Sequence, residues 1–144
     1  MKGDVRAVEG LPLRLMLVAL LVSLTVPTML SVMGQATEDV SSREMATIAA
    51  DVVGTVEEMS AAGPGNVRII DLPSVPAGMG LLIGGEEGSV DCMRVSWCSD
   101  GEVLGSRYLE DASVISESGP IELSSGDTLR LVCGPDGIVR VAVP

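Results

Sequence analysis

The chain has 144 residues, a formal net charge of −11 and no histidine. An acidic chain repels the phosphate backbone, so nucleic acid is excluded from the expected partners. Without histidine, Ser-His-Asp and Cys-His catalysis cannot be built, and a zinc site is not expected. We therefore predict a protein that is not an enzyme and that uses no metal or cofactor.

A short charged head, residues 1–10, precedes an apolar stretch, residues 11–33, which contains one charge (Arg14) and two prolines (Pro12 and Pro27). A helix over this stretch would be about 35 Å long, enough to cross a bilayer core of about 30 Å. The stretch is longer than the core of a secretory signal peptide, which favours permanent insertion over removal. Basic residues before it and acidic residues after it predict a cytoplasmic N-terminus and an external C-terminal domain.

An amphipathic pattern follows over residues 37–62, where apolar residues recur mostly every three or four positions. The stripe consists of Val40, Met45, Ile48, Val52, Val56 and Met59. This spacing predicts a helix that continues the apolar one, so that a single helix covers residues 11–62 and Pro27 kinks it without ending it. Gly63-Pro64-Gly65 should end the helix.

Residues 66–144 form the predicted β-domain, with short apolar runs separated by Gly, Pro, Ser and Asp turns. The expected strands are 67–72, 80–83, 90–98, 102–108, 113–116, 121–123, 128–133 and 138–143. Seven or eight short strands with frequent turns predict a small antiparallel sandwich or barrel. The fold class is therefore α+β, and the apolar stripe of the second half-helix is expected to cover an open sheet face.

Two carboxylate pairs, Glu86-Glu87 and Glu110-Asp111, fall at predicted turns. Paired carboxylates can carry acid–base chemistry or bind calcium, but charged turns more often serve solubility. No EF-hand spacing accompanies them, and we interpret them as solvated loop residues.

The three cysteines are Cys92, Cys98 and Cys133, without a CxxC pair. In an oxidising exterior two of them could form a disulfide, either Cys98 with Cys133 or Cys92 with Cys133, if their strands are neighbours. The alternative is that all three are small buried apolar residues.

Glu9 and Arg14 lie at the rim of the apolar stretch, where an ionised side chain is costly unless it is paired or reaches the interface. Their spacing of five residues is poor for a pair on the same helix. The two readings are ordinary membrane-rim charges or charges that meet a neighbouring chain during assembly.

These features together resemble archaeal type IV pilins and pilin-like proteins with class III signal peptides. The resemblance rests on a short head with a basic residue before a small one, a glutamate (Glu9) and the apolar stretch. It rests further on one long helix that ends at Gly63-Pro64-Gly65 and on the all-β C-terminal domain. The candidate processing sites are Gly3–Asp4 and Ala7–Val8.

The resemblance implies that a prepilin peptidase trims the head of a membrane-inserted precursor. Subunits would then self-assemble, with apolar helices in the filament core and β-domains on the cell surface, where they serve adhesion. Glu9 and Arg14 would act in assembly. The alternative function is a monomeric, membrane-anchored external domain that binds a glycan or a cell-surface partner.

Overall fold

A computed structural model describes residues 6–142, with side chains described from residue 12 onward. Helix α1 (Arg6–Ala62) contains both Pro12 and Pro27. It begins ahead of the predicted residue 11, because the change from polar to apolar residues marks a change of surface and not a helix end. Its end at Ala62 agrees with the prediction: Gly63 has φ 87° and Gly65 has φ 88°, a left-handed conformation that glycine adopts without strain.

The chain divides into two compact units, Met1–Asp39 and Val40–Pro144, called unit 1 and unit 2 below. Unit 1 consists of the first half of α1 in the described residues. Unit 2 combines the second half of α1 with all the strands. The second half of α1 therefore belongs to the folded unit and not to the apolar segment.

Eight strands follow α1 in the described residues, as the turn spacing predicted. They are β1 (Val67–Asp71), β2 (Met79–Ile83), β3 (Arg94–Ser99), β4 (Glu102–Tyr108), β5 (Val114–Ile115), β6 (Ile121–Leu123), β7 (Thr128–Cys133) and β8 (Val139–Ala142). They form two four-stranded sheets, with orders β1-β7-β8-β5 and β4-β3-β2-β6. All pairs of these strands are antiparallel except β5 with β8, which is parallel and whose long connection runs through β6 and β7.

The predicted strand 90–98 is only partly right. Its first residues form a 3₁₀ helix, η1 (Val90–Met93), and β3 begins at Arg94. A local contact stabilises this turn: the Cys92 thiol donates to the carbonyl of Ser89 at 2.9 Å. Met93 is consequently half exposed and does not share the buried face of β3.

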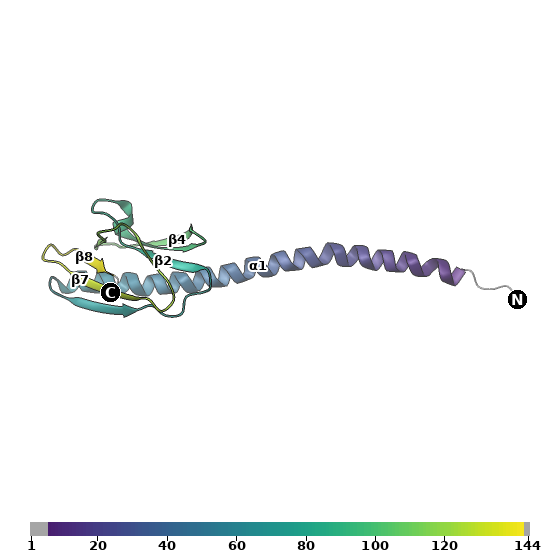
Figure 1. Cartoon of the computed structure of the whole chain (residues 1–144), viewed down its shortest axis with the longest axis horizontal. Helices are drawn as coiled ribbons and strands as arrows, with labels where there is room; N and C mark the ends of the chain where they lie inside the picture. Colours follow the sequence, from purple (N-terminus) through teal and green to yellow (C-terminus); the bar gives the residue numbers. More distant parts are fainter. Residues whose placement is uncertain (1–5, 143–144) are drawn as a thin grey trace. The chain divides into compact units, whose positions relative to one another are not determined.

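One hydrophobic core joins α1 to strands of both sheets. The side chains from α1 are Met45, Ile48, Ala49, Val52, Val53, Val56 and Met59. This set agrees with the predicted stripe except for Val40, which is exposed, and it is wider because strands of both sheets contribute to the same cluster. Figure 1 shows the second half of α1 running alongside the strands. The indole Nε1 of Trp97 on β3 donates to Ser42 Oγ on α1 at 3.1 Å, which adds a polar link to this packing.

Candidate assembly surface

Fourteen large apolar side chains between Leu13 and Met33 are exposed, and we call them the apolar surface. Their exposed fractions run from 47% at Val26 to 75% at Met16. They lie on all sides of the helix, since residues 12–40 are exposed without interruption. A surface this large and apolar is stable only in contact with lipid or with other protein.

Hydroxyl groups on the apolar surface bond to the helix that carries them. Ser23 Oγ donates to the Leu20 carbonyl at 2.9 Å, and Thr25 Oγ1 donates to the Leu21 carbonyl at 2.9 Å. Thr28 Oγ1 donates in the same way to the carbonyl of Thr25 at 2.8 Å. A hydroxyl that is satisfied by its own backbone needs no water, so these residues are compatible with a surface that becomes fully covered.

Ionisable side chains stand only at the two ends of the apolar surface. Residues 15–37 contain none, Arg14 precedes them, and Glu38 and Asp39 follow them. All three side chains are exposed. The uncharged segment is about 35 Å long at 1.5 Å per residue.

The other predicted assembly and processing residues fall at the edge of the described part of the chain. Gly3 and Asp4 lie outside the described residues. Ala7, Val8 and Glu9 belong to α1, but their side chains lie outside the described part.

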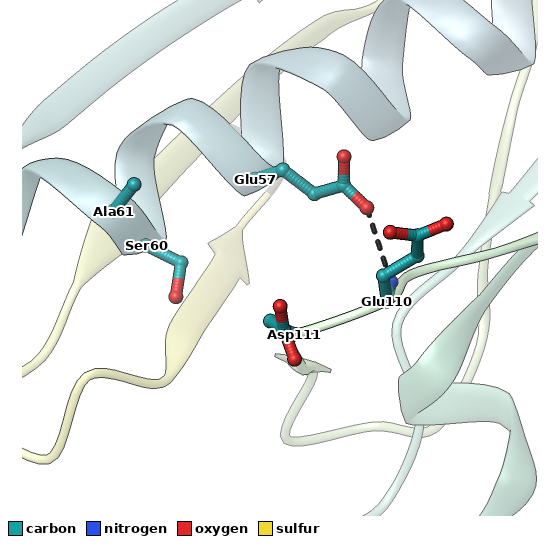
Figure 2. A pocket seen from close by; sticks show the side chains of 5 residues that line it. All are labelled: Glu57, Ser60, Ala61, Glu110 and Asp111. Atoms are coloured by element: carbon teal, nitrogen blue, oxygen red, sulfur yellow. Dashed lines mark hydrogen bonds between the residues drawn. The ribbon is translucent and has the colours of Figure 1, made fainter.

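A hollow of about 410 Å³ in unit 2 brings together carboxylates from distant parts of the sequence. Figure 2 shows Glu57 of α1 beside Glu110 and Asp111, which follow β4; Glu57 Oε1 accepts a hydrogen bond from the Glu110 backbone amide at 3.1 Å. The bond attaches this loop to the helix. Sequence reasoning placed Glu110 and Asp111 in a solvated loop, where they are exposed, but gave no sign of Glu57 as their neighbour.

In the part of the chain that the structure describes, no group of three His, Cys, Asp or Glu side chains is arranged to hold a metal ion. The other predicted carboxylate pair, Glu86-Glu87, is exposed in the connection between β2 and η1. The structure does not bring Glu86 and Glu87 into the hollow at Glu57.

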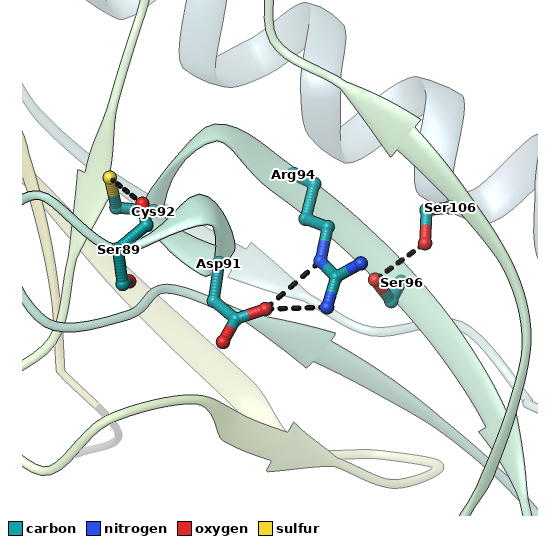
Figure 3. Close-up of polar contacts among 6 residues, drawn as sticks. All are labelled: Ser89, Asp91, Cys92, Arg94, Ser96 and Ser106. Carbon is teal, nitrogen blue, oxygen red and sulfur yellow. Dashed lines mark hydrogen bonds and ion pairs between the residues drawn. The ribbon is translucent and has the colours of Figure 1, made fainter.

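Small polar groups connect η1, β3 and β4. In Figure 3, Asp91 Oδ1 accepts two hydrogen bonds from the guanidinium of Arg94, at 2.9 and 2.6 Å. Ser96 and Ser106 share a hydroxyl–hydroxyl bond of 2.8 Å, which gives the buried Ser96 hydroxyl a partner. These contacts hold the strands and the turn together.

The three cysteines are free and buried in the structure, which is the second of the two arrangements that the sequence left open. A disulfide required that the strands be neighbours, but Cys98 lies on β3 and Cys133 on β7, in different sheets. Cys92 lies in η1. Burial raises the pKa of the Cys98 thiol, and the nearby Glu122 carboxylate raises it further, which keeps this thiol protonated.

One ion pair fixes the turn between β7 and β8. Arg140 donates to both carboxylate oxygens of Asp136, at 3.0 and 2.6 Å. This hydrogen bonding lowers the pKa of Asp136 to about 2, against an ordinary value of 3.8. Asp136 Oδ1 also accepts a hydrogen bond from the Ile138 backbone amide, so this carboxylate organises the hairpin.

Comparison with protein-family models, curated proteins and solved structures finds no match for this chain. The described residues contain one helix long and apolar enough to cross a membrane, Pro12–Ala62, in which a window of 18 residues has a mean hydropathy of 2.3. Such a segment could be a membrane anchor or a signal sequence.

Proposed function

We propose that the chain is a structural subunit of an archaeal type IV pilus-like surface filament. The observation that carries the proposal is the contrast between the two halves of α1. Its first half exposes fourteen apolar side chains, whereas its second half is built into the core of unit 2. A bilayer covers the apolar surface before assembly, and the helices of other copies cover it in the filament.

Unit 2 supplies the exterior of the filament. The chain carries a formal net charge of −11, and all its acidic residues lie outside the apolar stretch, residues 11–33. A charged, folded unit remains in water, while the apolar surface is buried away from water. In the filament, unit 2 contacts other filaments or the surfaces to which the cell adheres.

Processing by a prepilin peptidase precedes assembly in this proposal. A cut between Gly3 and Asp4 leaves α1 whole, because α1 begins at Arg6. A cut between Ala7 and Val8 removes the first residues of α1. Either cut retains Glu9, whose carboxylate would meet a cation of a neighbouring copy.

The test is the composition of filaments sheared from the surface of the cells that produce the chain. We expect the chain in the filament fraction, and we expect replacement of Gly3 and Ala7 by bulky residues to leave an unprocessed precursor in the membrane. A chain that remains a monomer in the membrane, with no filament fraction and no effect of those replacements, would instead support the membrane-anchored binding domain.

A further inference from the structure

The charges that bracket the apolar surface are complementary. Arg14 stands at one end, and Glu38 with Asp39 stands at the other, all within unit 1. Each is exposed, and none takes part in the ion pairs found among the described residues, which are Arg68–Glu58, Arg94–Asp91 and Arg140–Asp136.

Covering the apolar surface removes water from the guanidinium of Arg14. A guanidinium that loses water against apolar side chains is costly unless it gains an opposite charge. Among residues 12–39, whose side chains the structure describes, the carboxylates are Glu38 and Asp39; Glu9 precedes Arg14 and is assigned above to a cation of a neighbouring copy. Glu38 and Asp39 cannot reach Arg14 of their own helix, since 24 residues separate the two ends by about 36 Å.

We propose that Arg14 of one copy pairs with Glu38 or Asp39 of a second copy, whose helix is parallel and displaced by about 36 Å along the helix axis. The inference rests on the proposed filament, because it names one contact between its subunits. Parallel packing follows from insertion, since copies that enter the membrane by the same charge bias share one orientation. An antiparallel copy would carry its acidic unit on the opposite side of the membrane.

The two adjacent carboxylates widen the range of suitable helix rotations. Neighbouring residues on an α-helix differ by about 100° in direction, so Glu38 and Asp39 cover two sides of the helix. The long arginine side chain adds reach. Copies at intermediate levels cover the remaining apolar surface, and the pair fixes how far one subunit rises relative to the other.

The contact joins two different surfaces, the Arg14 end of one helix and the Glu38–Asp39 end of another. After each subunit is added, such a heterologous contact leaves one Arg14 end and one Glu38–Asp39 end of the assembly available for a further subunit. It therefore extends into an open assembly, whereas a two-fold contact would stop at a dimer.

A charge-swap experiment on the full-length chain in its producing cells tests the pairing. We expect Arg14→Glu alone, or Glu38→Arg with Asp39→Arg, to lower the yield of sheared filaments roughly tenfold or more, because each leaves like charges together. Combining the three substitutions should restore most of the yield. Arg14→Lys should assemble, since it keeps the charge.

Glu44→Arg provides the matched control, because Glu44 is an exposed carboxylate of α1 outside the proposed contact. Combined with Arg14→Glu, it should not restore filaments. The amount of each variant inserted in the membrane is measured in parallel, so that lost assembly is separated from lost insertion. Filaments unaffected by the single swaps, or rescued equally by Glu44→Arg, would overturn the pairing; an Arg14 that contacts lipid phosphate instead would leave Glu38→Arg with Asp39→Arg without effect.

Cross-linking measures the displacement without altering any charge. Leu13 and Thr37 have the same 24-residue spacing and exposed side chains. With Leu13→Cys and Thr37→Cys in one chain, oxidation should give a ladder of linked subunits, and either substitution alone should not; the native thiols are buried. Filaments without a ladder would overturn the displacement while leaving the proposed function intact, whereas a wild-type chain that forms no filament would overturn both.

Discussion

Deleting the second half of α1 from unit 2 is the perturbation that most clearly distinguishes the roles of the two halves of α1. We compare two fragments, residues 40–144 and residues 63–144. The first keeps every core side chain of α1, because its cut falls at the exposed Val40. The second lacks all seven, while keeping every strand. We expect the first fragment to fold cooperatively and the second to remain unfolded or aggregated.

The expected magnitude follows from the buried side chains. Six of the helix side chains in the core are Val, Ile or Met, and burying one such side chain stabilises by roughly 1.5–3 kcal/mol. Their loss removes roughly 9–18 kcal/mol, which is as large as the net stability of about 5–15 kcal/mol of a whole domain. The strands alone then expose their apolar faces to water.

The assay uses the single tryptophan, Trp97, which is 8% exposed and bonded to Ser42. In the longer fragment we expect blue-shifted emission and one cooperative urea transition. In the shorter fragment we expect red-shifted emission and no transition. A shorter fragment with a cooperative transition at a similar urea concentration would refute the assignment of the second half of α1 to the core.

Three further predictions concern unit 2. Gly105→Ala should destabilise the fold by about 1–3 kcal/mol, because its Cβ would overlap the indole of Trp97. Gly54→Ala has open space at its Cβ and should stabilise the fold by about 0.5–1 kcal/mol. Urea unfolding measures both free energies, and equal effects would contradict the packing of Gly105 against Trp97. Hydrogen bonding from Arg140 lowers the pKa of Asp136 to about 2, so the stability that this ion pair contributes is present above about pH 4 and is lost as the pH falls toward 2. Asp136→Asn should remove this loss from the plot of unfolding free energy against pH, and an unchanged plot would refute the pairing. The three buried thiols should resist a thiol reagent in the folded chain and all react after unfolding, so a count of one reactive thiol in denaturant would indicate a disulfide.

The sequence signals for helix and strand limits were strong where glycine and proline mark turns. Gly63 and Gly65 fixed the end of α1, and β6 and β7 begin and end at the predicted residues. The 3₁₀ turn Val90–Met93 was missed, because a run of mostly apolar residues directly before a strand fits the strand as well as a turn. Its local bond from Cys92 to Ser89 could not be read from spacing alone.

Contacts between distant residues account for the other differences. The apolar stretch was recognisable from composition, and its exposure follows from the lack of any core partner for residues 12–40. The position of Glu57 beside Glu110 depends on how the loop after β4 meets α1. The separation of Cys98 and Cys133 depends on which strands share a sheet, which short strands of similar composition do not reveal.

The most direct test of the proposed filament subunit is the intact mass of the chain recovered from sheared surface filaments. We predict a processed chain that begins at Asp4 or Val8 and carries both the apolar surface and unit 2. A chain found only in the membrane, with its head intact from Met1, would contradict the proposed function.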